Sequence, residues 1–250
     1  MKNQLARIDE KKKKLDSFRP LPPALVKNLD EWFKIALTYS SNAIEGNTLS
    51  HSETALVIEK GITIGGKTIT EHLEAINHGN AIDFIKELAQ KKRDALCLDD
   101  ILSIHRIILK GIDPMHAGIF RTVAIRILGS DNIFPNYLKI PILMTEFMLW
   151  LSTTQDHPVE IAAMAHFKIV SIHPFVDGNG RTARLLMNLL LLQQGYPLAI
   201  IKKEDRKSYI NSLELANSTN DLSAFNAIIF QAVEDGLDSY LEAINQSKII

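Results

Sequence analysis

Apolar residues recur roughly every three or four positions along most of the chain, a spacing that predicts amphipathic helices. The segment 24–45 shows the pattern well. Its apolar groups stand at Leu25, Leu29, Trp32, Phe33, Ala36 and Leu37. Gly46 and Asn47 follow, and both residue types suit the left-handed conformation at which helices commonly end. We therefore expect a helix that ends close to Gly46.

Capping motifs mark the starts of two further helices. Ser50 is followed by Glu53, and Thr68 by Glu71, so each pair places an acid three residues after a hydroxyl. These pairs predict a short helix after Ser50 and a longer one over about residues 70–90. More helices are expected over about residues 99–111, 158–172, 181–194, 205–217 and most of 222–244.

The first 18 residues are mostly charged, and they predict a solvent-facing helical arm. Pro20, Pro22 and Pro23 should end this arm, because proline lacks the amide hydrogen that a helix needs. The run of lysines at 11–14 is expected to form a solvated face of the arm rather than a contact with nucleic acid.

Strand signals are confined to two short segments. Residues 121–134 alternate between apolar and polar types around a turn-like glycine-serine-aspartate step, which predicts a β-hairpin. A second, smaller hairpin is expected between Ile62 and Thr68, around a pair of glycines. The fold class is therefore expected to be all-α, with an inserted hairpin and an N-terminal helical arm. The expected parts are the arm at 1–34, a core at 35–220 and a C-terminal helix that packs on the core at 221–250.

Composition narrows the class of protein. The 250 residues are 46% hydrophobic and 23% charged, as in a folded globular protein, and the net charge is −1. This balance provides no field that would draw the chain to nucleic acid or to an anionic membrane. The most apolar run, 185–201, is interrupted by polar residues and a proline, so it is too broken to span a bilayer.

Cysteine usage and the N-terminus bear on the compartment. Cys97 is the single cysteine, so an intrachain disulfide is impossible, and this usage fits a reducing compartment. The N-terminal residues carry charges with no apolar stretch behind them, so no secretory signal is visible. We therefore expect a soluble cytoplasmic protein.

The string HPFVDGNGRTAR, which begins at His173, concentrates the chemistry of the chain. Pro174 disfavours a helical conformation at the residue before it, so the preceding helix should end at His173. Gly178 and Gly180 permit a tight backbone turn into a new helix near Arg181. The free amides at the start of that helix would form an anion site.

Four side chains add to this anion site. Asp177 is a hard oxygen ligand, suited to an Mg²⁺ ion that bridges phosphates. Arg181 and Arg184 lie three residues apart, on one helix face, and both can bind phosphate oxygens with forked hydrogen bonds. His173 supplies a base that titrates near neutral pH. On these residues alone, the loop is either a phosphate site or a structural helix end followed by a turn.

The whole string resembles the signature of the Fic family of protein adenylyltransferases. That signature reads His-x-Phe-x-Asp/Glu-Gly-Asn-Gly-Arg-x-x-Arg, and the chain matches it at all eight fixed positions. The resemblance extends over roughly residues 35–215. It implies a helical core that moves AMP from ATP to a Ser, Thr or Tyr hydroxyl of a target protein, with ATP as substrate and Mg²⁺ as cofactor.

The resemblance also implies a role for each residue of the signature. His173 would deprotonate the target hydroxyl, Asp177 would hold Mg²⁺, and Arg184 would bind the outer phosphate of ATP. Phe175 would anchor the loop in the core. The phosphate cradle would consist of Gly178, Asn179, Gly180 and Arg181.

Two further segments resemble parts of that family's fold. The predicted hairpin, near 125–134, resembles the flap on which an extended target segment docks by strand addition. Asp205, Arg206 and Tyr209 resemble a patch that lines the nucleotide-base pocket, although a plain amphipathic helix also explains them. A homodimer through the N-terminal helix is left open.

Residues 41–46 read SNAIEG and resemble the family's inhibitory pattern at Ser41, Glu45 and Gly46. Their position before the core implies the class with an N-terminal inhibitory helix. The helix dipole disfavours a glutamate at a helix C-terminus, so Glu45 is expected to pair with a cation, and Arg184 is the candidate. The alternative is that Glu45 is simply a polar residue at a helix end.

Three functions therefore compete. The first is a protein adenylyltransferase that is self-inhibited by Glu45. The second is a de-AMPylase, which removes AMP from a modified protein and uses Glu45 to position the attacking water. The third is a nucleotide-binding toxin or sensor with little turnover. Gly180 and Arg184 argue against a related phosphotransferase branch, which has lysine in place of the glycine and lacks the last arginine.

Overall fold

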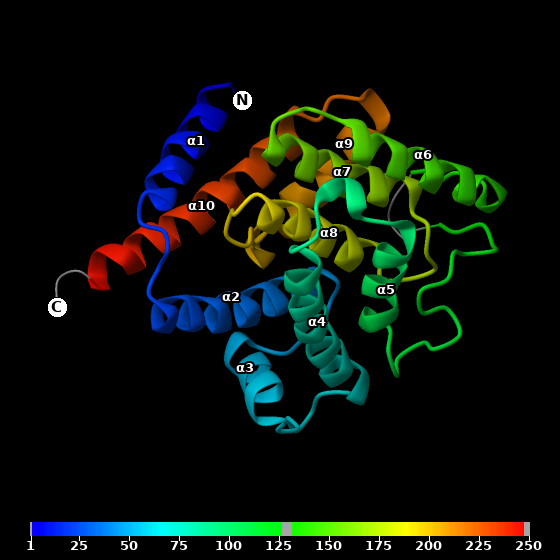
Figure 1. Cartoon of the computed structure of the whole chain (residues 1–250). Helices are drawn as coiled ribbons and strands as arrows, with labels where there is room; N and C mark the ends of the chain where they lie inside the picture. The colour runs from blue at the N-terminus through cyan, green and yellow to red at the C-terminus, as the bar shows by residue number, and fades with distance from the viewer. Residues whose placement is uncertain (1, 127–131, 248–250) are drawn as a thin grey trace.

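The structure is a computed structural model of the chain, and it describes residues 2–126 and 132–247 (Figure 1). These residues form ten α-helices and three short 3₁₀ turns, and they contain no β-strand. The helices are α1 (Lys2–Asp16), α2 (Pro23–Ile44), α3 (His51–Lys60), α4 (Ile69–Leu88), α5 (Leu98–Ile108), α6 (Ile140–Thr153), α7 (Pro158–Ile172), α8 (Asn179–Gln193), α9 (Arg206–Thr219) and α10 (Ser223–Ser247).

The two predicted capping boxes are present and begin α3 and α4. Ser50 Oγ accepts the Glu53 N–H, and the Glu53 carboxylate accepts the Ser50 N–H. Thr68 and Glu71 form the same reciprocal pair. The sequence pattern missed α6, because apolar residues cover its outer face as well as its buried one. Leu149, for example, is 65% exposed.

The most buried helix is α8, which runs through the centre of the molecule (Figure 1). Its residues from 181 to 191 are all buried, and it packs against α7, α4 and α5 and also contacts α2. A helix that is buried on every side is stable only when other helices surround it. This packing fixes the N-terminal end of α8, where the signature string lies.

The N-terminal arm is not free in solvent. Helix α1 packs along α10, and both Ile8 and Leu15 are fully buried. Arg7 binds Glu234 through two parallel hydrogen bonds of 3.1 and 3.0 Å, a forked geometry that adds directional specificity. None of the described helices is long and apolar enough to cross a membrane.

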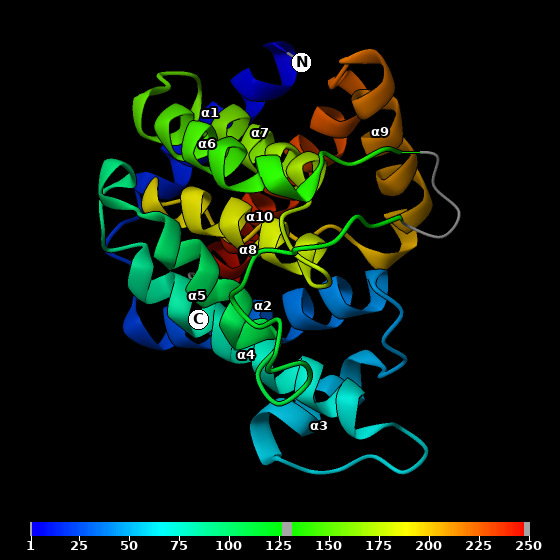
Figure 2. The same ribbon diagram turned by 90° about the vertical axis from the view of Figure 1, so that its right-hand side faces the viewer.

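The hairpin expected at 121–134 is not present as paired strands in its described parts. The turn at its centre lies outside the described residues, and neither 121–126 nor 132–134 forms a strand. Figure 2 shows the two arms of this segment leaving the helical body in the same direction. The Arg121 guanidinium donates hydrogen bonds to the carbonyls of Val123 and Pro135, so one side chain joins the two arms at their base.

The smaller hairpin expected between Ile62 and Thr68 is wrong. Gly65 and Gly66 do form a turn, which the Lys67 N–H closes on the Ile64 carbonyl at 3.4 Å, but its flanks form no strands. The Ile64 N–H donates to His72 Nε2 at 2.8 Å, so a side chain of α4 takes the hydrogen bond that a partner strand would have accepted.

Candidate active site

The segment between α7 and α8 forms a tight loop that one asparagine closes. His173 ends α7 in a left-handed conformation with a φ of 50°, and Gly178 precedes α8 with a φ of 77°. Asn179 Oδ1 accepts the Phe175 N–H at 2.9 Å, and Asn179 Nδ2 donates to the Phe175 carbonyl at 2.9 Å. The Asn179 side chain therefore shapes the loop. The first amides of α8 have no acceptor within the helix, so they provide an anion site.

Phe175 lies in the core beneath the loop, where it stacks on a histidine of α5. The two ring centroids are 3.7 Å apart and the planes differ by 6°. His105 Nε2–H donates to the Asp177 carbonyl at 2.9 Å, while Nδ1 accepts the Gly118 N–H at 2.9 Å. Burial lowers the pKa of His105 to about 4, so a neutral ring of fixed tautomer supports the loop.

His173 is placed as a neutral base. Burial lowers its pKa to about 4, against the raising effect of its hydrogen bond with Val170. His173 Nδ1–H donates to the Val170 carbonyl at 3.2 Å, because a carbonyl can only accept, and this leaves Nε2 free to take a proton. The Phe134 ring lies over His173, with centroids 4.2 Å apart.

Arg121 ties His173 to the arms of the predicted hairpin. The buried guanidinium donates from Nε to the His173 carbonyl at 2.8 Å, from Nη1 to Val123 at 2.8 Å and from Nη2 to Pro135 at 2.6 Å. The Arg121 N–H also donates to the Pro174 carbonyl at 2.9 Å. One residue thereby fixes the backbone of His173 relative to both arms.

Asp177 is the exposed carboxylate of the loop. Its side chain is 63% exposed, and its Oδ2 lies 2.9 Å from Arg181 Nη2. Arg181 is itself buried, and its Nη1 donates to Glu74 Oε1 at 2.9 Å. Mg²⁺ in phosphate sites is commonly held by one or two carboxylates, with phosphates and water completing the shell. A single accessible carboxylate beside an anion site fits this ion.

Arg184 and Glu45 form the pair that the sequence predicted. Arg184 is 2% exposed, and its Nη2 lies 2.6 Å from Glu45 Oε1. Ser41 adds two contacts, because Arg184 Nε donates to Ser41 Oγ at 2.9 Å and Nη2 donates to the Ser41 carbonyl at 3.0 Å. The end of α2 is therefore fastened to the first turns of α8.

Glu45 also lies over the expected phosphate cradle. A Cβ atom added to Gly180 would overlap Glu45 Oε1, so the carboxylate rests against the first turn of α8. Its side chain remains 37% exposed. A negative charge in this position occupies the space in which an anion would bind, and it would repel that anion.

Tyr209 lies behind Arg184. It is 1% exposed, and its hydroxyl lies 3.5 Å from Arg184 Nη1 and 2.9 Å from His166 Nε2. Arg206, from the same predicted patch, donates to the Ile44 carbonyl at 2.6 Å. Both side chains thus contact the elements that hold Glu45. The expected contact of this patch with a nucleotide base stays a prediction.

Sequence comparison relates this chain to one known protein family. A model described as the Fic/DOC family matches residues 95–191. "Protein adenylyltransferase Fic" of Culex quinquefasciatus is 40% identical over 243 residues, covering 96% of this chain and 48% of that protein. The protein of the same name from Nematostella vectensis is 37% identical over 240 residues, covering 95% of this chain and 55% of that protein.

Solved structures agree over nearly the whole chain. Fic-1 (aa134–508) from C. elegans superposes with a TM-score of 0.87 at 34% identity, covering 98% of this chain and 73% of that one. A Fic domain containing signaling protein from Bacteroides thetaiotaomicron has a TM-score of 0.87 at 31% identity, covering 96% and 98%. This chain belongs to the Fic/DOC family. It spans about half the length of the curated relatives it matches.

The Fic/DOC fold brings the signature string and the inhibitory-type string together, although more than a hundred residues separate them. Glu45 and Arg184 are 139 positions apart. Other contacts to the Fic loop come from residues that the sequence did not single out for this purpose. These are Glu74, His105 and Arg121.

Two buried histidines lie near the loop, and their hydrogen bonds are to protein groups. Within residues 2–126 and 132–247, no group of three or more histidine, cysteine or acidic side chains could hold a metal ion. His105 and His166 instead hydrogen-bond to the Asp177 carbonyl and the Tyr209 hydroxyl. His105 therefore supports the loop, whereas His166 supports Tyr209 behind Arg184.

Proposed function

We propose that this chain moves AMP from ATP to a Ser, Thr or Tyr hydroxyl of a protein, and that Glu45 restrains the reaction. The observation that carries the proposal is the neutral His173 beside the N-terminus of α8, where one loop joins a base to an anion site. Relatives named protein adenylyltransferase support the same reaction.

His173 acts as the general base. Its Nε2 takes the proton of the target hydroxyl as that oxygen bonds to the α-phosphorus of ATP. The bond between the α-phosphorus and the oxygen that bridges to the β-phosphate breaks, and pyrophosphate leaves. The hydrogen bond from Nδ1 to the Val170 carbonyl keeps Nε2 in the acceptor form.

The start of α8 binds the phosphates. Backbone amides at Gly178, Asn179 and Gly180, together with Arg181, stabilise negative charge that develops there. Asp177 would hold Mg²⁺ against the phosphates, and the ion would supply positive charge for the leaving pyrophosphate. Phe175 and His105 keep this loop in place from below.

Glu45 acts as the brake because it competes with ATP for Arg184. Arg184 has one guanidinium, and its Nη2 is bound to Glu45 and to the Ser41 carbonyl. While Glu45 holds that position, the γ-phosphate loses its cation and meets a like charge. ATP then binds with its α-phosphate out of line, and a misplacement of about 1 Å can cost ~10²-fold in rate.

A de-AMPylase is the second candidate, and the partial exposure of Glu45 favours it. A carboxylate that is 37% exposed beside the phosphate site can position a water for attack on AMP bound to a protein. The same loop would then hold the phosphate. A sensor or toxin module with little turnover is the weaker alternative, because His173 and Asp177 are both in place.

The proposed reaction also implies binding partners for the chain. The segment 125–134 is the proposed docking site for an extended part of the target, and Phe134 and Arg121 link that segment to His173. We also propose a homodimer and a cytoplasmic location, which suits the single Cys97. The chain is proposed to divide into parts at 1–34, 35–220 and 221–250.

Parallel labelling with α-labelled and γ-labelled ATP tests the reaction type. The Glu45→Gly variant is incubated with each nucleotide, with cell lysate as a source of targets. AMP transfer predicts protein label from the α position alone. Label from the γ position would instead identify phosphoryl transfer and reject the proposal.

A further inference from the structure

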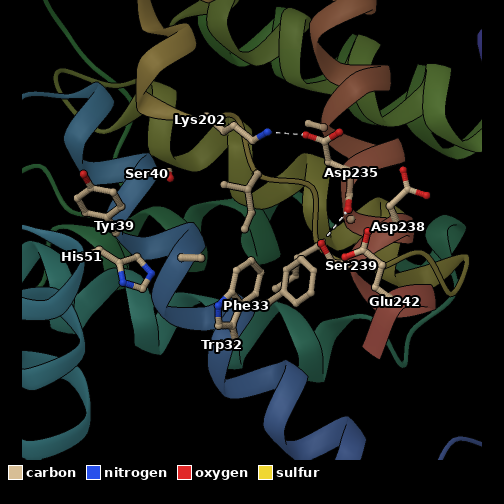
Figure 3. A pocket seen from close by; sticks show the side chains of 15 residues that line it. Trp32, Phe33, Tyr39, Ser40, His51, Lys202, Asp235, Asp238, Ser239 and Glu242 are labelled. Carbon is tan, nitrogen blue, oxygen red and sulfur yellow. Dashed lines mark hydrogen bonds and ion pairs between the residues drawn. The ribbon is translucent and has the colours of Figure 1, made fainter. Parts of the chain in front are cut away.

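A groove of about 520 Å³ lies between α2 and α10 (Figure 3). Residues of α2 at positions 32, 36, 39 and 40 line one wall. At about 100° per residue, these positions share a helix face roughly opposite the one that presents Ser41 and Glu45 to Arg184. The groove is therefore separate from the phosphate site, and its volume is in the range of small-molecule pockets.

The wall formed by α2 is aromatic. Trp32 is 49% exposed beside the groove, and Tyr39 stands two turns further along the helix. The floor is apolar, and it is formed by Phe33, Leu198 and Ile200. The Lys203 ammonium already lies 5.0 Å from the centre of the Tyr39 ring, so the exposed Trp32 ring is the one that can attract an organic cation or an apolar group.

The wall formed by α10 is acidic. Asp235, Asp238 and Glu242 recur at three and four residues, so all three lie on one face of the helix. Asp235 is paired with Lys202 at 2.7 Å, and Asp238 is paired with Lys11 at 2.6 Å. Glu242 makes no ion pair or hydrogen bond among the described residues. The groove therefore has one unmatched carboxylate at its α10 side.

Ser40 supplies an unused polar group on the opposite side of the groove. It is 7% exposed and lines the groove, yet its hydroxyl makes no hydrogen bond within the described part of the chain. Figure 3 shows Ser40 and Glu242 on opposite sides of the groove, with Phe33 between them. A hydroxyl that opens onto a groove and has no protein partner bonds to water or to a ligand.

We propose that this groove binds a small organic cation with an aromatic body. The ammonium group pairs with Glu242, the ring lies on the apolar floor beside Trp32, and a hydroxyl or similar group at the far end bonds to Ser40. The requirement for two polar ends and an apolar middle is set by the residues of the groove. The proposal is independent of AMP transfer, because none of these residues belongs to the phosphate site.

Three matched probes test the site. Tyramine carries both the ammonium and the far hydroxyl, phenethylamine lacks the hydroxyl, and 4-ethylphenol lacks the ammonium. The chain has two tryptophans, so its NMR spectrum has two indole N–H signals, and Trp150→Phe assigns them. Tyramine should shift the Trp32 signal saturably and leave that of Trp150 in place. It should bind at least ~3-fold more tightly than either other probe.

Two variants test which residue of the groove binds each polar end of tyramine. Glu242→Gln should abolish the advantage of tyramine over 4-ethylphenol, and Ser40→Ala should abolish its advantage over phenethylamine. Glu146→Gln, an exposed acid on α6, is the matched control and should change neither. The proposal is overturned if the Trp32 signal does not move, if all three probes bind equally, or if Glu242→Gln leaves the order of affinities unchanged.

Discussion

Arg184 Nη2 lies 2.6 Å from Glu45 Oε1, and the same nitrogen donates to the Ser41 carbonyl at 3.0 Å. A buried guanidinium that already donates to both oxygens of Ser41 and to the Glu45 carboxylate has little capacity left for a phosphate. Glu45 contacts Arg184 through one oxygen, so the exchange of this contact for a phosphate does not require α2 to unfold.

Removal of the Glu45 side chain should release the brake. Glu45→Gly frees Arg184 without touching His173 or Asp177, so self-labelling with α-labelled ATP should rise by up to about 10²-fold. Glu31→Gly is the matched control, because Glu31 is an exposed residue of the same helix. Equal self-labelling by wild type and Glu45→Gly across a range of ATP and Mg²⁺ concentrations would return Glu45 to a structural role.

Arg184→Ala should not imitate this gain. The substitution also breaks the Glu45 contact, but it removes the cation that would bind the outer phosphate. Labelling by Arg184→Ala should therefore stay at or below the wild-type level. A gain as large as that of Glu45→Gly would mean that Arg184 takes no part in binding ATP.

The base can be removed without loss of the nucleotide site. His173→Ala, made in the Glu45→Gly background, should lower transfer by about 10²–10⁴-fold while ATP still binds. The phosphate contacts come from α8 and its arginines, so calorimetry should give an ATP affinity close to that of the parent. Undiminished labelling would assign the base elsewhere.

Asp177 should make the reaction depend on a divalent metal. A carboxylate beside an anion site repels phosphate unless a cation lies between them. Asp177→Ala should therefore lose the activity that Mg²⁺ restores after EDTA treatment of the parent. If ATP affinity and activity are the same with and without Mg²⁺ in the parent, Asp177 has no such role.

Arg121 should act as a positioning residue. Arg121→Lys keeps the charge but loses the fork that reaches three carbonyls, so His173 should shift relative to bound ATP. We expect self-labelling in the Glu45→Gly background to fall by about 10-fold to 10²-fold, with ATP affinity little changed. Arg106→Lys, on exposed α5 surface, is the control. A parallel loss of ATP affinity would indicate a general loss of structure instead.

Buried histidines should make the fold sensitive to acid. Burial lowers the pKa of His166 to about 3, whereas an unfolded histidine titrates near ~6.5. Between these values the unfolded chain binds a proton that the folded chain does not. The free energy of unfolding is therefore highest above about pH 6.5 and falls by about 1.4 kcal/mol per pH unit for each such group as the pH decreases. His166→Gln, which keeps a hydrogen-bond acceptor for Tyr209, should flatten this decline in denaturation experiments. An unchanged slope would show that His166 does not titrate in this window.

The fold and the centre of the site follow from local sequence. Capping boxes, helix periodicity and the His173–Arg184 string are short-range signals, and each depends on residues within a few turns of one another. The Glu45–Arg184 pair was predicted from the resemblance of residues 41–46 to the family's inhibitory pattern, which the misfit of a glutamate at a helix C-terminus supported. The prediction of the smaller hairpin was wrong because His72 accepts a hydrogen bond from the Ile64 N–H, and no residue between 62 and 68 indicates that contact.

The supporting contacts could not be predicted for the same reason. His105 and the Asp177 carbonyl are 72 positions apart, and Arg121 and the His173 carbonyl are 52 apart. Each is a single polar residue whose partner is a backbone atom on another element. No spacing rule relates such residues, and only the packing of α5, α7 and α8 brings them together.

Intact-mass spectrometry after incubation with ATP and Mg²⁺ tests the central claim most directly. Three chains are compared: the wild type, Glu45→Gly, and Glu45→Gly combined with His173→Ala. The account predicts added mass equal to one or more AMP groups on Glu45→Gly, little on the wild type and none on the double variant. Phosphate-sized additions, or AMP additions that persist without His173, would contradict it.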